Sequence, residues 1–165
     1  AGMKIMSAPN ILLTRIDNRL VHGQVGVTWT STLGANLLIV VDDDVAKDEI
    51  QQKLMGITAD TYGFGIRFFS IEKTAAIISK AAPHQKIFLI CRTPEIVRKL
   101  IEAGVPLKDV NVGNMHYANG KQQIAKTVSV DANDITAFNG LKTAGVECFV
   151  QGVPTEAALD LFKLL

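Results

Sequence analysis

The apolar run in segment 36–42, N-L-L-I-V-V-D, constrains the fold more than any other feature, because five apolar residues follow one another without a polar interruption. A strand with one face in water alternates apolar and polar residues, so this run predicts a strand that is buried on both faces. Segment 86–92, K-I-F-L-I-C-R, has the same pattern. Strands of this kind occur in mainly parallel sheets that are covered by helices on both sides.

Helical patterns lie between the predicted strands along most of the chain. We expect strands at 11–16, 36–42, 66–70, 86–92, 110–113, 127–130 and 146–151. We expect helices at 24–34, 46–58, 72–81, 93–104, 133–143 and 155–165, and a loop at 114–121. This alternation predicts an α/β fold with three layers, α/β/α, around a mainly parallel sheet of about six or seven strands joined by right-handed crossovers.

Apolar positions within the predicted helices indicate which faces pack on the sheet. The helix at 46–58 carries Ile50, Leu54 and Ile57 at positions i, i+4 and i+7, so we expect this face to be buried. Trp29 falls on the apolar side of the first helix and is expected in the core, close enough to the preceding loop to brace it.

Length and charge restrict the class of protein. A chain of 165 residues with 48% hydrophobic residues has the size of one ordinary domain, which we place at 10–165. Segment 1–9 has no periodic pattern and is set aside as a tail, part of which, before Met3, is interpreted as an expression remnant. Seventeen basic and sixteen acidic side chains leave a net charge of +1, which gives no general attraction to nucleic acid or to a membrane surface.

Membrane insertion, a disulfide and a metal site are not expected. The longest apolar run, Leu37 to Val41, is far shorter than the roughly 20 residues that span a bilayer, and no secretory signal opens the chain, so we expect a cytoplasmic protein. Cys91 and Cys148 lie in apolar runs without the spacing of metal ligands, which favours reduced, buried thiols.

The loop after the first predicted strand collects the side chains with the strongest chemistry. Arg15, Asp17, Arg19 and His22 fall within eight residues, at the end of the strand and before the helix that Gly23 allows to begin. Open α/β sheets bind ligands beyond the carboxyl ends of their strands, where helix N-termini point backbone N–H groups at anions. The loop is therefore predicted to bind an anion.

The wording of this loop, R-I-D-N-R-L-V-H-G-Q, resembles the phosphorylation-site loop of the IIB components of the sugar phosphotransferase system (PTS), mannose/fructose/sorbose family. The resemblance covers about 10–165 and includes V-V-D-D-D-V-A, K-L-M-G-I, N-V-G-N-M and V-P-T. The longer stretch I-D-N-R-L-V-H-G-Q-V-G-V-T-W-T-S-T-L-G-A-N looks closest to the N-acetylgalactosamine or galactosamine branch.

The resemblance implies a phosphocarrier and assigns roles within the loop. His22 would be the phosphohistidine nucleophile, which attacks phosphorus only when neutral, and nearby cations disfavour its protonated form. Arg19 would bind the phosphoryl oxygens through its bidentate guanidinium. Asp17 would orient His22 or hold Arg19, or it is an Asx-turn residue. Arg15 either reaches the site or pairs with an acid nearby.

Three neighbours complete the predicted phosphate-binding loop. Asn18, Gly23 and Gln24 offer backbone N–H groups or side-chain amides to the phosphate, and a glycine permits close approach. Phosphoryl transfer needs alignment and charge stabilisation, so no metal and no cofactor are expected. Leu20 and Val21 are expected to give the site an apolar rim for partner proteins.

The resemblance also implies partners. His22 would accept phosphate from the phosphohistidine of a IIA protein and deliver it to a sugar held by the membrane-embedded IIC and IID subunits, as a protein-N(pi)-phosphohistidine–sugar phosphotransferase. The IIB protein would be cytoplasmic and peripherally associated with that transport complex. In this family the acceptor atom is Nδ1.

An acidic cluster, Asp42, Asp43 and Asp44, gives the competing hypothesis. Such a cluster at a strand end binds Mg²⁺ and accepts phosphate in receiver-type domains, so a receiver-like or regulatory α/β binding domain is the alternative. Receiver-like chains need a second aspartate at a later strand end, however, and segment 86–92 ends in Arg92. A charged loop or helix N-terminus is the simpler interpretation.

Other strand ends leave the membership of the site open. Arg92, Asn114 and His116 follow predicted strands that face the same edge, and ordinary loop polarity explains them equally well. His84 lies in a turn that contains a proline and is expected in solvent.

Overall fold

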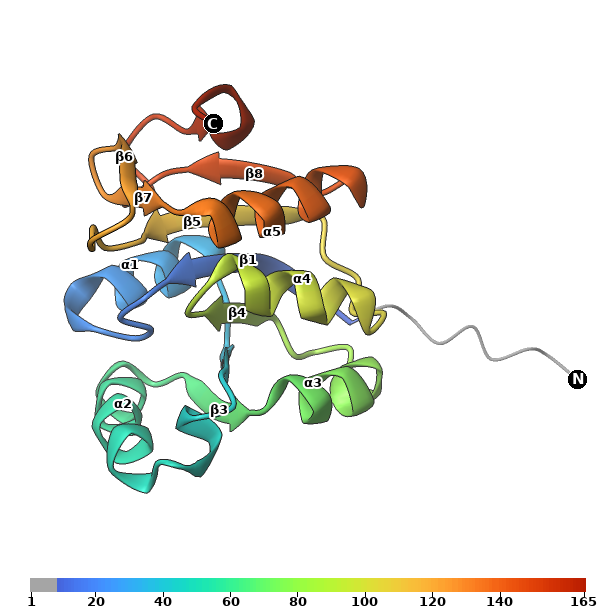
Figure 1. The fold of residues 1–165 in the computed structure, drawn as a ribbon. Coiled ribbons are helices and arrows are strands. Elements are labelled where there is room, and N and C mark those ends of the chain that lie inside the picture. Colours follow the sequence, from blue (N-terminus) through green and yellow to red (C-terminus); the bar gives the residue numbers. More distant parts are fainter. Residues whose placement is uncertain (1–8) are drawn as a thin grey trace, which may run out of the picture.

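The computed structural model, which describes residues 9–165, places both apolar runs on interior strands of a seven-stranded sheet (Figure 1). The strand order is β3-β2-β4-β1-β5-β8-β9, and only the β8–β9 pair is antiparallel. The strands are β1 (Ile11–Asp17), β2 (Leu37–Val41), β3 (Gly65–Phe69), β4 (Ile87–Cys91), β5 (Asp109–Asn114), β8 (Glu147–Val150) and β9 (Leu159–Asp160). The predicted mainly parallel sheet is confirmed.

Helices cover both faces of this sheet, which confirms the three predicted layers. The helices are α1 (Gly23–Leu33), α2 (Glu49–Tyr62), α3 (Ile71–Ile77), α4 (Pro94–Glu102) and α5 (Ala132–Thr143). Alternate residues of β2 point to opposite faces: Ile39 packs in the core beneath α3, α4 and α5, whereas Val40 packs in the core beneath α1 and α2. Two hydrophobic cores result, one on each face, and the side chain of Trp29 is buried in the second.

Two elements differ from the sequence-based prediction. Segment 155–165 is not a helix. Leu159–Asp160 pairs with β8 as an antiparallel edge strand, and Leu161–Lys163 forms a single 3₁₀ turn. Asp160 is the N-cap residue of this turn, and its carboxylate accepts a hydrogen bond from Phe162 N. Segment 122–125 is a strand that was not predicted. It forms β6 (Gln122–Ala125), which pairs with β7 (Val128–Val130) in a small antiparallel sheet outside the main one.

Helix α2 is turned the other way from its predicted orientation. Met55 and Ala59 are its buried residues, whereas Ile50, Leu54 and Ile57 are 74%, 63% and 62% exposed. The expectation that this apolar face packs on the sheet was wrong.

The two cysteines are buried, as expected. Cys91 and Cys148 are free and buried, and burial raises the pKa of the Cys148 thiol to about 12. No helix in the described chain, residues 9–165, is both long enough and apolar enough to cross a membrane.

Candidate functional site

The loop between β1 and α1 leaves the carboxyl edge of the sheet between the neighbouring strands β4 and β5. Leu20 has a left-handed backbone with φ of 60°, an unfavourable conformation for a residue with a side chain. Its side chain and that of Val21 are buried in the core, and Leu20 N donates to Asp17 O over 3.0 Å. The prediction of an exposed apolar rim at Leu20 and Val21 is therefore wrong, because these side chains anchor the loop to the hydrophobic core.

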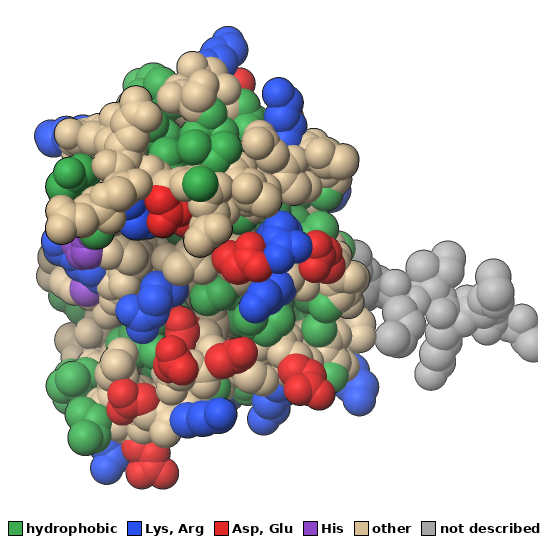
Figure 2. Space-filling model, in the orientation of Figure 1, with side chains coloured by type: hydrophobic (Ala, Val, Ile, Leu, Met, Phe, Trp, Pro, Cys, Tyr) green, Lys and Arg blue, Asp and Glu red, His purple; other side chains and the backbone are tan. Residues whose placement is uncertain are grey.

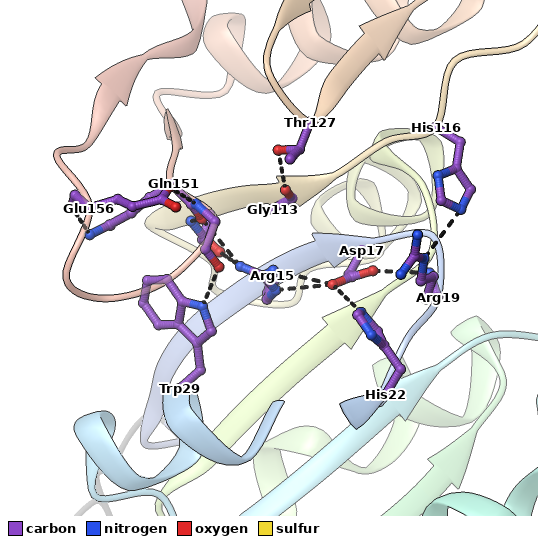
Figure 3. Close-up of polar contacts among 12 residues, drawn as sticks. Arg15, Asp17, Arg19, His22, Trp29, Gly113, His116, Thr127, Gln151 and Glu156 are labelled. Carbon is purple, nitrogen blue, oxygen red and sulfur yellow. Dashed lines mark hydrogen bonds and ion pairs between the residues drawn. The ribbon is translucent and has the colours of Figure 1, made fainter. Parts of the chain in front are cut away.

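Asp17 lies at the centre of the polar cluster (Figure 3). Its Oδ2 atom is 3.2 Å from His22 Nε2, and its Oδ1 atom accepts a hydrogen bond of 3.0 Å from the backbone N–H of Arg19. An ionised carboxylate only accepts hydrogen bonds, so Nε2 of His22 carries the proton in this pair, and Nδ1 of a neutral ring keeps its lone pair. The His22 side chain is 27% exposed, which leaves the ring accessible from solvent.

Arg15 is buried behind Asp17. Its side chain is 3% exposed, Nη2 donates to Asp17 Oδ2 over 3.2 Å, and Nη1 donates to Asn111 Oδ1 and to Gln151 O. The guanidinium also lies 5.5 Å from the centre of the Trp29 ring. Burial lowers the pKa of Arg15 from its ordinary value, and the charge of Asp17 opposes this effect. Of the two predicted roles for Arg15, pairing with a nearby acid is the one the geometry supports.

A segment from the other end of the chain closes over Arg15. Trp29 Nε1 donates to Gly152 O over 2.9 Å, and Asn111 Nδ2 donates to Gln151 O over 2.9 Å. A hydrogen bond of 2.8 Å from Gln151 Nε2 to Glu156 O stabilises this loop after β8 internally (Figure 3). None of these contacts with the segment after β8 was predicted from the sequence.

Arg19 is the exposed cation of the site. Its Nε atom donates to His116 Nε2 over 3.4 Å, and both side chains lie at the surface. His116, which follows β5, is thus brought to the site. Figure 2 shows histidine and basic side chains together at the left margin of the molecule, on the side to which the β1 arrow points in Figure 1.

Arg92 also joins the site, as a support for the loop. It donates from Nη1 to Asn18 O over 3.1 Å and from Nε to Asp42 Oδ2 over 3.1 Å. Asn18 N donates to Asn114 O over 3.0 Å, while Asn18 Oδ1 is buried and has no hydrogen-bond partner among residues 9–165.

The remaining predicted residues lie at the start of α1. His22 is the N-cap residue of this helix, and its side chain makes no capping hydrogen bond, so the N–H groups of the first turn stay free of a side-chain cap. Gly23 has φ of 49°, and Gln24 Nε2 donates to Tyr62 OH over 3.0 Å. Gln24 therefore points toward α2 here.

The acidic cluster has ordinary structural contacts. Asp42 Oδ1 accepts hydrogen bonds of 3.0 Å from Asp44 N and Val45 N, and Asp43 Oδ1 accepts one of 2.9 Å from Ile71 N. Among residues 9–165, no group of three or more His, Cys, Asp or Glu side chains is arranged to hold a metal ion.

Comparison with known proteins decides the family. The model of the PTS system sorbose subfamily IIB component matches residues 11–165. The chain belongs to the sorbose subfamily of PTS IIB components. It is 72% identical over 149 residues, which are 90% of this chain and 94% of the relative, to the N-acetylgalactosamine-specific phosphotransferase enzyme IIB component 1 of Escherichia coli K12.

Solved structures of PTS IIB components have the same fold. The crystal structure of the E. coli N-acetylgalactosamine-specific IIB component 1 superimposes with a TM-score of 0.90 at 70% identity, covering 92% of this chain and 99% of that one. A PTS-dependent N-acetylgalactosamine IIB component of Streptococcus pyogenes gives 0.91 at 36% identity, covering 96% and 99%. The receiver-like alternative is not favoured for a PTS IIB component.

Proposed function

We propose that this PTS IIB component carries a phosphoryl group on Nδ1 of His22, accepting it from a phosphohistidine of a IIA protein and passing it to a sugar. The observation that carries this proposal is the contact between Asp17 Oδ2 and His22 Nε2. An ionised Asp17 would accept a hydrogen bond from Nε2–H in this contact, which would leave the nucleophilic lone pair on Nδ1, in a ring that solvent reaches.

The two transfers conserve the high-energy bond until the last step. In the first, the N–P bond of the donor histidine breaks as the bond from His22 Nδ1 to phosphorus forms. In the second, a sugar hydroxyl attacks phosphorus, its proton is released and His22 returns to the neutral form. The charge on phosphorus moves and is not created, so positioned cations and N–H groups are sufficient.

Arg19 and the first turn of α1 supply these groups. Arg19 has an exposed guanidinium whose contact with His116, at 3.4 Å, is weak enough to exchange for phosphoryl oxygens. The backbone N–H groups of the first turn of α1, which starts with Gly23 and Gln24, lie at the positive end of the helix dipole. Arg15 acts through Asp17, since its donors are occupied by the protein. Asn18 adds its side-chain amide –NH₂ group as a further donor in the loop, since its backbone N–H already donates to Asn114 O.

The names of the relatives suggest the sugar and the setting. We propose N-acetylgalactosamine or galactosamine as the sugar, because the IIB component that is 72% identical is named for N-acetylgalactosamine. Segment 10–165 would work as a single IIB domain in the cytoplasm, charged by IIA and associated peripherally with membrane IIC and IID subunits. Its reaction class would be that of a protein-N(pi)-phosphohistidine–sugar phosphotransferase.

Phosphorylation mapping tests the proposal. The protein is incubated with phosphorylated IIA of an N-acetylgalactosamine system, and the labelled residue is identified by its stability and by substitution. Label on His22 should survive alkali and be lost in acid. The His22→Ala variant should take up no label, whereas His84→Ala, which removes an exposed histidine from a distant turn, should label like the parent. Undiminished labelling of His22→Ala, or label that is lost in alkali, contradicts the proposal.

A further inference from the structure

The outer face of α2 carries an apolar stripe that nothing in the described chain covers. Ile50, Leu54 and Ile57, the outer stripe, are 74%, 63% and 62% exposed. Their spacing of i, i+4 and i+7 places them on one line along the helix, directly opposite the buried Met55 and Ala59. A helix that has one apolar face in the core needs no second one for folding. A continuous exposed stripe of this kind marks a surface that contacts another molecule.

The outer stripe lies on the same side of the molecule as the candidate site. Tyr62 ends α2, and its OH accepts the 3.0 Å hydrogen bond from Gln24, two residues beyond His22. In Figure 1, α2 and the first turn of α1 lie on the left, at the margin where Figure 2 shows the histidines. A specific interface covers about 800 Å² per partner, a patch of roughly 16 Å radius. An interface of this size around His22 that extends toward Tyr62 leads onto the face of α2 that carries the stripe.

The charge around the stripe indicates what kind of partner protein binds there. Segment 43–62 carries five carboxylates and two lysines, and Figure 2 shows acidic side chains around the hydrophobic ones at this place. The carboxylates are those of Asp43, Asp44, Asp48, Glu49 and Asp60. Cytoplasmic loops of membrane proteins have an excess of Lys and Arg, which complements such a surface. A bare bilayer surface is anionic and would repel it.

We infer that the outer stripe of α2 docks on the basic cytoplasmic loops of the membrane-embedded sugar-transport subunits while His22 passes its phosphoryl group to the sugar. The inference rests on the proposed function and adds the surface that makes the second transfer specific. On this inference, the phosphohistidine donor approaches His22 without using the stripe. The two partners thus share His22 and differ in the surface around it.

The test separates the two transfers. The main variant combines Ile50→Gln, Leu54→Gln and Ile57→Gln, and its control is Ile135→Gln, an exposed apolar residue on α5 in the opposite helix layer. Charging is measured with phosphorylated IIA. Delivery is measured as sugar phosphorylation by membrane vesicles that contain the IIC and IID subunits of an N-acetylgalactosamine system, at increasing concentrations of phosphorylated IIB.

The triple variant should raise the KM for phosphorylated IIB in the vesicle assay by about tenfold or more, with charging kinetics within about twofold of the parent. Asp60→Lys, which leaves the apolar residues intact, should raise the same KM, while Glu147→Lys at the start of β8 should not. Circular dichroism verifies that each variant is folded. Addition of salt should raise the KM of the parent, because the attraction is between exposed charges.

Three results would overturn the inference alone. The first is a triple variant whose KM in the vesicle assay is unchanged, and the second is a triple variant whose KM rises only in the charging assay. The third is a parent protein that is a dimer in solution, together with a triple variant that is a monomer and delivers the phosphoryl group as well as the parent does. A parent protein that takes no phosphoryl group from IIA would refute the proposed function, and this inference with it.

Discussion

Substitution of Gly113 by alanine should disable the site without touching His22. A Cβ atom at Gly113 would lie closer than 3.0 Å to Cζ, Nη1 and Nη2 of Arg15, whereas ordinary van der Waals contact begins at 3.4 Å. A small shift within its present contacts cannot relieve the clash, since the guanidinium is buried, faces the ring of Trp29 and is hydrogen-bonded to Asn111. It must therefore leave Asp17.

Two effects of Gly113→Ala follow from this clash. Overpacking of a buried site costs about 1–3 kcal/mol in the free energy of unfolding. Loss of the hydrogen bonds from Arg15 frees Asp17 to rotate away from His22 Nε2, and misplacement of a reacting group by about 1 Å slows transfer by about 10²-fold. Urea unfolding measures the first effect, and single-turnover phosphorylation of His22 by phosphorylated IIA measures the second.

Gly56→Ala is the matched control. A Cβ at Gly56, inside α2, meets no atom within 4 Å, so alanine there should leave the rate unchanged and stabilise the protein by about 0.5–1 kcal/mol. In an Arg15→Ala background, Gly113→Ala should cost little further stability or rate, because the clashing group is gone. Gly113→Ala with the stability and rate of the parent, or equal effects in both backgrounds, would refute the reasoning.

Three further predictions concern other groups. Arg19→Ala should fold normally and accept phosphate about 10²- to 10³-fold more slowly, the scale for one lost transition-state donor; a rate within about twofold of the parent would contradict its role. The pKa of Asp131 is lowered, chiefly by the hydrogen bond from the Asp134 backbone in the capping box of α5. The ionised Asp131 therefore contributes its full stabilisation above the pKa of about 3.9 of an aspartate in the unfolded chain, and this stabilisation is lost as the pH falls through the lower pKa of the folded state. Asp131→Asn should therefore flatten the fall in stability below about pH 4 in urea titrations, and a slope equal to that of the parent would count against this. The thiols of Cys91 and Cys148, whose pKa values are raised by burial, should react with Ellman's reagent at about pH 8 only as fast as the protein unfolds; complete labelling of the native protein within minutes would disprove this.

The sequence predicts the main sheet well because the evidence for it is local. The unbroken apolar runs of β2 and β4 permit no half-exposed strand, and Thr93 with Pro94 specifies the start of α4. The last segment was mispredicted because pairing with β8 outweighed a weak helical pattern, as long-range contacts often do. The outer stripe of α2 was placed on the wrong side, since periodicity locates an apolar face and does not say what packs on it.

Part of the candidate site could likewise be predicted from the sequence, and part could not. The loop contributes Asp17, Arg19 and His22 from neighbouring positions, so their proximity could be predicted. The groups that hold Arg15 come from β5 and from the loop after β8, and only the parallel register, which sets Arg15 beside Asn111, brings them together. A single signal was available for them: Asn111 is a polar residue between two valines in a short buried strand.

The packing around Trp29 has a practical consequence. This residue is the only tryptophan in the chain, and its indole spans α1, the guanidinium of Arg15 and the carbonyl of Gly152. Its ultraviolet emission is therefore an intrinsic, label-free optical reporter of whether the two ends of the polypeptide have come together. A stopped-flow fluorimeter could follow that event during refolding, or while a phosphoryl group arrives, in the unmodified protein.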